Sequence, residues 1–235
     1  MKHIKLVALL ALIIGTSSCE RALWDSGDLI VEDRSLAEFY TGLDVDGNID
    51  VIITSNDSYD VRVETGSRKI KHIVTEVIDE VLYVYEERNN VADDKQTKVF
   101  IDQEFLDKIN LDGSGDISAQ ALESADMDIN VRGSGDIDLR FLEVNSVDAS
   151  IRGSGDIVLS GEGESVNFDI DGSGDIDALD LPVEFASVLI DGSGDVSVNV
   201  SNELNVVING SGDVNYLGSP IVSTEINGSG DVGPL

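Results

Sequence analysis

The sequence has very few of the residues that enzymes use as nucleophiles and general bases. It contains one cysteine, Cys19, and two histidines, His3 and His72. A lone cysteine excludes an intramolecular disulfide, and His3 lies in a segment that we expect to be removed from the mature protein. The mature chain therefore has almost no residues from which a catalytic site based on histidine or cysteine could be formed. We expect His72, inside a short helical candidate at residues 68–73, to be a surface residue, and we predict that the protein is not an enzyme.

Basic residues are also scarce. The chain has 15 Lys and Arg against 46 Asp and Glu, and its formal net charge is −31. Nucleic acid is excluded as a partner, because its binding requires a basic surface. Cations, basic proteins and neutral sugars remain as ligands. Acidity also keeps a long β surface soluble and discourages association through strand edges, and we assign most of the carboxylates to that role.

The sequence has no apolar run long enough to form a membrane-spanning helix. The run at residues 6–14 follows a basic stretch and precedes small residues, a pattern typical of a secretory signal peptide, which we place at residues 1–18. Cys19 then resembles the lipidated cysteine of bacterial lipoproteins, although Thr16 stands where such signals usually have Leu. We predict an exported protein, lipid-anchored at Cys19 in the cell envelope, at the outer membrane or cell surface, with residues 19–30 as a tether. An ordinary signal peptide with an incidental cysteine is the alternative.

A short phrase recurs through the second half of the chain. Gly-Ser-Gly-Asp occurs seven times, and successive copies are separated by 20, 20, 19, 20, 18 and 18 residues. A fixed period of this length indicates a repeat architecture. Residues 46–51 resemble a decayed copy of the phrase, which suggests that the same architecture begins earlier.

Apolar and polar residues alternate around each copy. The positions two residues before and four residues after the first glycine are always Ile, Val or Leu, as at Ile151 and Ile157. Period-two alternation is typical of strands with one buried face. Both glycines of each copy share the parity of the buried positions, so we predict a corner between two strands at which their missing side chains would point inward. The corner glycines are Gly113, Gly115, Gly133, Gly135, Gly153, Gly155, Gly172, Gly174, Gly192, Gly194, Gly210, Gly212, Gly228 and Gly230.

Repeats of about 20 residues with two short strands each predict an all-β protein. We expect a β-solenoid, a β-helix-like stack whose apolar columns form one continuous core, over residues 106–235. Residues 31–105 are expected to form an N-terminal β region, with strands at 50–54, 61–64, 81–85 and 98–101, where β-branched and aromatic residues gather. Nothing in the composition marks a boundary near residue 105, so the two regions are also compatible with one continuous domain.

Stacking of the coils would also align polar residues. Arg132 would lie beside Asp112 and Arg152 beside Asp171, while the repeat serines and aspartates would each form a line on the outside. Like charges at strand spacing repel, so either the carboxylates accept hydrogen bonds from turn amides or a cation bridges them. We favour the capping role and expect no cofactor, with calcium as the alternative because it takes carboxylate oxygens. The aligned aspartates are Asp116, Asp136, Asp156, Asp175, Asp195, Asp213 and Asp231.

Carboxylates are the one route to catalysis that the composition leaves open. Solenoid enzymes that cleave polysaccharides use Asp, Glu, Arg and calcium, and in the predicted stack Asp136, Asp156, Arg132 and Arg152 would crowd together. The intervals between copies, however, vary only between 18 and 20 residues, which leaves no long loops to wall a cleft. A polysaccharide-active enzyme is therefore a weaker hypothesis than binding or scaffolding.

Repeated Gly-Ser-Gly-Asp followed by Ile or Val, behind an alternating β segment and a lipoprotein signal, resembles the adhesin family called the head GIN domain. The resemblance covers residues 29–235. It implies a solenoid-like all-β fold, export in a Gram-negative bacterium and a role in adhesion, without catalytic residues. We therefore expect a non-catalytic envelope lipoprotein that binds a glycan or protein ligand through a repetitive β surface, or a structural scaffold without a ligand. The terminal coil after Val232 is a candidate surface for homo-oligomers.

Overall fold

The computed structural model describes residues 28–36, 38–54, 60–87, 91 and 94–235. The signal peptide, Cys19 and most of the proposed tether lie outside the described residues. Within the described ranges, no helix has both the length and the apolar character needed to cross a membrane.

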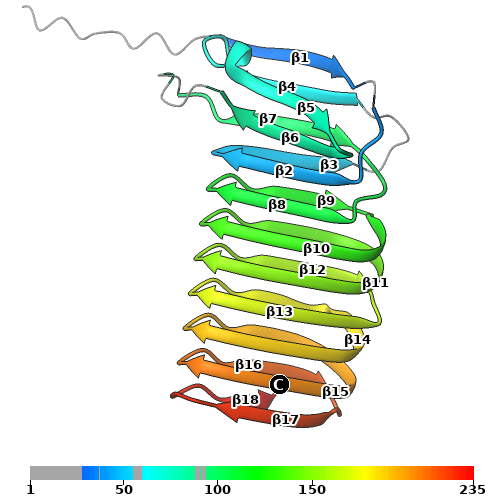
Figure 1. The fold of residues 1–235 in the computed structure, drawn as a ribbon, viewed down its shortest axis with the longest axis vertical. Helices are drawn as coiled ribbons and strands as arrows, with labels where there is room; N and C mark the ends of the chain where they lie inside the picture. Colours follow the sequence, from blue (N-terminus) through cyan, green and yellow to red (C-terminus); the bar gives the residue numbers. More distant parts are fainter. Residues whose placement is uncertain (1–27, 37, 55–59, 88–90, 92–93) are drawn as a thin grey trace, which may run out of the picture.

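The chain forms a flattened stack of coils, each with one strand segment on either side of a thin core (Figure 1). One face contains, in stack order, β5 (Ile73–Ile78), β6 (Val81–Glu86), β2 (Gly42–Gly47), β8 (Lys108–Gly113), β10 (Glu123–Gly133), the second half of β11 (Ile137–Gly153), β13 (Ser165–Gly172), the second halves of β14 (Ile176–Gly192) and β15 (Val196–Gly210), and β17 (Ile221–Ile226). The other face contains β1 (Leu29–Ser35), β4 (Asp60–Gly66), β7 (Thr97–Asp102), β3 (Ile49–Thr54), β9 (Ile117–Gln120), the first half of β11, β12 (Ile157–Glu162), the first halves of β14 and β15, β16 (Val214–Gly218) and β18 (Val232–Pro234). The predicted all-β solenoid is confirmed.

The core is built from the apolar columns that the sequence predicts. Ile151 lies in register with Val131 on one neighbouring coil and with Ile170 on the other, and all three side chains are buried. The strands of the repeats pair in parallel, so equivalent residues stack directly. Each coil therefore adds its apolar residues to one continuous core, as expected for a solenoid.

The strands differ from the prediction in length. We predicted two short strands for every coil, yet β11 and β14 each contain 17 residues and β15 contains 15. These strands pass from one face to the other without interruption. The register shifts between neighbouring coils occur along this turn, for example between Leu139 and Leu142, so the differences in repeat length are absorbed there and not at the Gly-Ser-Gly-Asp corners.

The N-terminal region belongs to the same hydrogen-bonded sheet as the repeats. The coil of β2 and β3 pairs directly with β8 and β9, and Gly47 lies in register with Gly113. The decayed copy at residues 46–51 is therefore the first corner of the stack, as predicted. After β3 the chain forms β4 to β7, which extend the stack at its N-terminal end, above β2 and β3 in Figure 1. It then returns to the other side of β2 and β3, where β8 begins. The predicted strands appear as β3, β4, β6 and β7, and the helical candidate is a single 3-10 turn, η1 (Ile70–His72).

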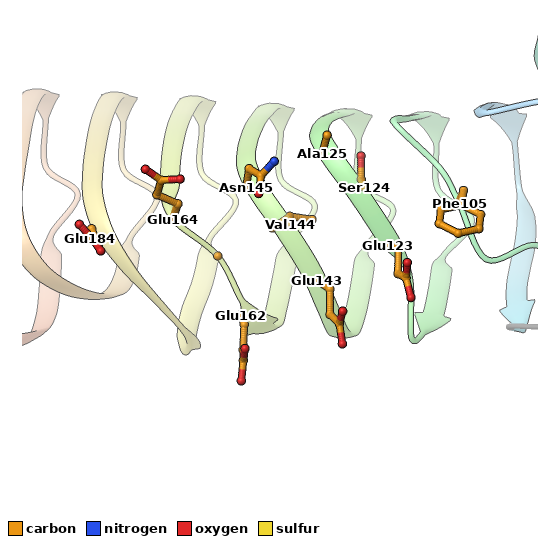
Figure 2. A pocket seen from close by; sticks show the side chains of 11 residues that line it. Phe105, Glu123, Ser124, Ala125, Glu143, Val144, Asn145, Glu162, Glu164 and Glu184 are labelled. Carbon is orange, nitrogen blue, oxygen red and sulfur yellow. The ribbon is translucent and has the colours of Figure 1, made fainter.

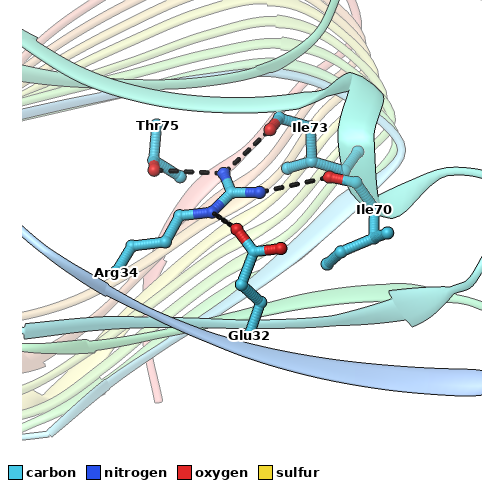
Figure 3. Close-up of polar contacts among 5 residues, drawn as sticks. All are labelled: Glu32, Arg34, Ile70, Ile73 and Thr75. Carbon is cyan, nitrogen blue, oxygen red and sulfur yellow. Dashed lines mark hydrogen bonds and ion pairs between the residues drawn. The ribbon is translucent and has the colours of Figure 1, made fainter.

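Antiparallel pairs close the N-terminal end of the stack. β4 pairs antiparallel with both β1 and β7, and β5 pairs antiparallel with β6. Arg34 of β1 reaches across to the other face, where its guanidinium donates to the Ile70 carbonyl at 3.1 Å, the Ile73 carbonyl at 2.8 Å and the Thr75 hydroxyl at 3.2 Å (Figure 3). Its Nε also donates to a Glu32 carboxylate oxygen at 2.9 Å. One side chain thus ties the two faces together at this end.

Candidate functional site

The seven Gly-Ser-Gly-Asp segments lie along one edge of the stack, which we call the corner edge. Each segment connects the end of one strand to the start of the next, as residues 133–136 connect β10 to β11. In six of the seven copies, all but the last at Gly228, the first glycine adopts a left-handed backbone conformation, with φ of 143° at Gly153. Residues with a side chain rarely adopt this conformation, so the first position favours glycine.

Both glycines are also required by the approach of the preceding coil. A Cβ atom on Gly153 would lie 2.1 Å from the Gly133 carbonyl oxygen, and one on Gly155 would lie 2.0 Å from the Gly135 oxygen. We predicted that the missing side chains would point into the core. At the first glycine a side chain would instead point along the stack into backbone atoms, and at the second it would meet the backbone together with, in most copies, a buried Leu or Ile of the core. Glycine at the corner therefore permits the close approach of the coils.

The repeat aspartates form a ladder of hydrogen bonds along the corner edge. The backbone N–H of Asp156 donates to Oδ1 of Asp136 at 2.9 Å, and the N–H of Asp175 donates to Oδ1 of Asp156 at 2.8 Å. The same bond joins every pair of neighbouring corners, at 2.7 to 3.3 Å, through Asp50, Asp116, Asp136, Asp156, Asp175, Asp195, Asp213 and Asp231. Each of these carboxylates except that of Asp231 accepts a hydrogen bond from the next coil, which offsets the repulsion between like charges at strand spacing.

The corner edge also contains the predicted stack of charged residues before the glycines. The register places Arg132 beside Asp112 and Arg152 beside Asp171, as predicted. The ion pairs among the described residues nevertheless do not include either arginine. In the described ranges, no group of three or more His, Cys, Asp or Glu side chains is arranged to hold a metal ion.

The opposite edge, where the long strands turn between the faces, carries two adjoining grooves. We call it the bend edge. The first groove has a volume of about 700 Å³, and Figure 2 shows Glu123, Glu143 and Glu162 in a row along it, with Phe105 at one end. These three glutamates lie in register on consecutive coils. Glu164 and Glu184 line the same groove further along the stack, so its surface is strongly acidic.

The second groove combines an aromatic ring with polar groups. It shares Glu143 and Glu162 with the first and also contains Phe141, which is 68% exposed, and the half-exposed Val158. Arg140 borders it and donates to both carboxylate oxygens of Asp138, at 2.8 to 3.1 Å. This hydrogen-bonded pair raises the pKa of Arg140 above its ordinary value. Such a surface can contact the apolar side of a ligand and accept hydrogen bonds from its hydroxyl or amino groups.

The position of Phe141 is set by the bend. Its φ is 58°, and Ala121, which occupies the equivalent bend on the preceding coil, has φ of 61°. A non-glycine residue in this conformation is strained. The shared conformation belongs to the turn, and Ala121 shows that the turn does not require a large aromatic side chain.

Sequence reasoning missed the bend edge. By strict alternation Phe141 would face inward with Ile137 and Leu139, but the left-handed residue reverses the alternation, so that Leu142 is buried and Phe141 is exposed. The signal was available as two adjacent apolar residues at the same place in consecutive coils, Ala121–Leu122 and Phe141–Leu142. The repeats have no long loops, as the short intervals between copies predicted. The turns at the bend edge nevertheless form grooves.

Comparisons with known proteins agree with the fold. The family model described as "Putative auto-transporter adhesin, head GIN domain" matches residues 39–220. A putative adhesin from Bacteroides fragilis is 21% identical with a TM-score of 0.82, and the alignment covers 88% of this chain and 97% of that one. A putative adhesin from Parabacteroides distasonis is 26% identical, with a TM-score of 0.70 and coverage of 89% and 98%.

A third solved structure, a putative lipid binding protein from Parabacteroides distasonis, is 23% identical with a TM-score of 0.70 and covers 89% of this chain and 97% of its own. No curated protein matches the sequence. The family model spans most of the chain, including the first corner and nearly all of the repeats. The chain therefore belongs to the head GIN domain family of putative auto-transporter adhesins.

Proposed function

We propose that the protein is a non-catalytic, lipid-anchored adhesin of the cell envelope that binds a glycan at the bend edge. Membership of an adhesin family supports a role at the surface or in the envelope. The observation that carries the proposed site is Phe141, an aromatic side chain that is 68% exposed and lines the same groove as Glu143 and Glu162. Because Ala121 adopts the same backbone conformation at the equivalent bend, the fold does not require an aromatic ring at this position. We therefore assign the ring to ligand binding.

The chemistry of the groove suits a sugar. A pyranose has an apolar face that can lie on an aromatic ring, and hydroxyl groups that can donate hydrogen bonds to Glu143 and Glu162. Hydrogen bonds to ionised carboxylates are stronger than those between neutral groups. The same carboxylates repel acidic polysaccharides, so we expect a neutral or amino-bearing glycan.

The row of Glu123, Glu143 and Glu162 in the first groove favours a second candidate, a basic segment of a protein ligand. Attraction between exposed charges is screened by salt. Binding of a Lys-rich segment should therefore weaken steeply between low and high ionic strength, whereas binding of a neutral glycan should change little. A protein that binds neither class would be a structural scaffold.

We expect Phe141→Gly to weaken ligand binding without loss of stability. Glycine accepts the left-handed backbone at no steric penalty, and the exposed ring contributes little to the core, so the melting temperature should stay the same or rise. Affinity should fall by about tenfold or more, as for an aromatic residue at the centre of a binding site. The measurement is a glycan and peptide array followed by calorimetry, on the chain from Glu20 onward, with and without calcium.

A matched variant, Ile78→Ala, removes an exposed apolar side chain from the hairpin of β5 and β6, which lines neither groove, and should bind as the wild type does. Equal binding by wild type and Phe141→Gly would exclude this groove as the site. Binding that appears only with calcium would instead implicate the aspartate ladder as a cation site.

Cys19 is the proposed anchor, on the basis of the signal segment that precedes it. Changing Cys19→Ala removes the thiol that a lipid would modify, so we expect the variant to move from the membrane fraction to the soluble envelope fraction. Fractionation followed by immunoblotting measures this. A variant that remains with the membranes would show that another feature holds the protein there.

A further inference from the structure

β17, the last described strand on its face of the stack, is an open sheet edge. In the described part of the chain no strand pairs with the side of β17 that faces away from β15, and Ile221 and Ile226 at its ends are 78% and 41% exposed. Glu225 is the only charged residue of β17, and the strand pairs with β15 without a register shift. A straight, weakly charged edge of this kind is a template for another strand.

The other terminal strands carry features that block such pairing. β1 contains Glu32, Asp33 and Arg34 in succession, and charges on an edge strand discourage pairing. On β5, the Ile73 carbonyl already accepts a hydrogen bond from Arg34. On the other face at the C-terminal end, β18 is only 3 residues long and includes Pro234, which has no N–H to donate. β17 is thus the terminal strand without such a feature.

We propose that β17 pairs antiparallel with β17 of a second copy, so that two stacks join end to end. The hydrogen-bonding direction of β17 follows from the N–H of Asn227, which donates to the Ile208 carbonyl of β15 at 2.7 Å. Because backbone groups alternate in direction along a strand, those of residues 223 and 225 also point to β15. The N–H and C=O groups of Val222, Thr224 and Ile226 therefore point outward, toward the second copy.

One register of the pair uses all of these groups. If Thr224 lies opposite Thr224 of the second copy on a two-fold axis, Val222 lies opposite Ile226 and each pair exchanges both backbone hydrogen bonds. A shift that centres the axis on Ser223 instead places Pro220 opposite Ile226 and loses a donor. The backbone thus favours the Thr224-centred register.

Side chains agree with this register. Thr224 and Ile226 share the core-facing columns of Val206 and Ile208, so Val222 and Ile226 of the two copies would extend the core across the junction. On the outer face, Ser223 would lie opposite Glu225, and its hydroxyl could donate to that carboxylate. No like charges lie opposite each other within the strand, which matters for a chain of net charge −31.

The association closes at two copies. A two-fold contact uses the same surface on both partners, so it leaves no second β17 to recruit a third copy. The charged β1 and the occupied β5 edge at the far ends prevent the stacks from extending into a filament.

The test is the oligomeric state of the chain from Glu20 onward, which contains every described residue, by sedimentation equilibrium over a range of concentrations. We expect a monomer–dimer equilibrium without larger species. Thr224→Pro removes the central outward N–H without breaking a bond to β15 and should give a monomer. A wild type that stays monomeric up to its solubility limit, or one that forms open-ended polymers, would overturn the proposal.

A charge pair at position 223 tests the register itself. Ser223→Lys places a cation opposite Glu225 of the second copy and should tighten the dimer, whereas Ser223→Glu places like charges there and should weaken it by about tenfold, since the contact occurs twice. Residue 223 is exposed in the single chain, so the monomers of both variants should have similar melting temperatures. In the double variant Ser223→Cys, Glu225→Cys, oxidation should give a covalent dimer, because non-hydrogen-bonded antiparallel pairs lie about 4.5 Å apart at Cα. Equal affinity of the Lys and Glu variants would exclude this register.

Discussion

Gly155→Ala is expected to destabilise the protein by about 3 kcal/mol, through steric overlap with the neighbouring coil. The added Cβ would lie 2.0 Å from the Gly135 carbonyl oxygen. Backbone atoms cannot move aside as the end of a side chain does, because the coils above and below are held by hydrogen bonds. Equilibrium denaturation in urea, followed by circular dichroism, measures the effect.

Two matched variants separate this cause from a general effect of replacing residues near the corner. Gly163→Ala makes the same chemical change on the bend edge, where the new Cβ would meet side-chain carbons no closer than 3.4 Å, so it should be neutral or slightly stabilising. Ser154→Ala lies between the two corner glycines but is exposed, and should change stability by no more than about 0.5 kcal/mol. Similar denaturation midpoints for Gly155→Ala and Gly163→Ala would refute the close approach of the coils.

Arg34→Met is expected to loosen the N-terminal end of the stack and lower stability by roughly 3 kcal/mol, because a charged donor is removed from partly buried carbonyls. The arginine side chain is only 17% exposed, and methionine keeps its apolar stem while it removes every donor. Hydrogen exchange should accelerate in β1 and β5 and remain slow in the repeats, since coils far along a solenoid depend mainly on their own neighbours.

Arg62→Met provides the control for Arg34. Arg62 also donates to a carboxylate, Asp33, at 2.8 Å, but both side chains are more than half exposed, and exposed ion pairs contribute little to stability. If the two variants lose equal stability, the carbonyl contacts of Arg34 are not what holds the N-terminal end together.

The repeats could be predicted from the sequence because every coil has apolar residues and corner glycines at the same positions. The columns represented by Ile151 and Ile157 predicted the buried faces, and the residues between them predicted the corners. The prediction did not identify what the glycines avoid, since alternation describes the two faces of a strand and gives no information about the distance along the stack. That distance becomes apparent only when Gly135 and Gly155 are placed on adjacent coils.

The bend edge and the N-terminal end were not predictable in the same way. At the bend, one left-handed residue reverses the alternation, and so a pattern of period two assigns Phe141 to the wrong side. Residues 55–107 contain no repeat, and strand propensity alone cannot decide that β4 runs antiparallel to β7 while β3 runs parallel to it. The contact of Arg34 with Ile70 and Ile73 joins segments far apart in sequence, for which composition gives no signal.

The two ends of the stack have a consequence for adhesion. β1 and β18 lie at opposite ends (Figure 1), and Cys19 shortly precedes β1 in the sequence. If Cys19 carries the proposed anchor, the β1 end of the stack is the one joined to the membrane, and β17 lies at the other end. Two stacks joined end to end through β17 would then carry their anchors at opposite ends of the dimer, an arrangement that suits two membranes facing each other. If both proposals hold, pairing through β17 would join two cells, and because the two partners are copies of the same chain, either cell could supply either partner.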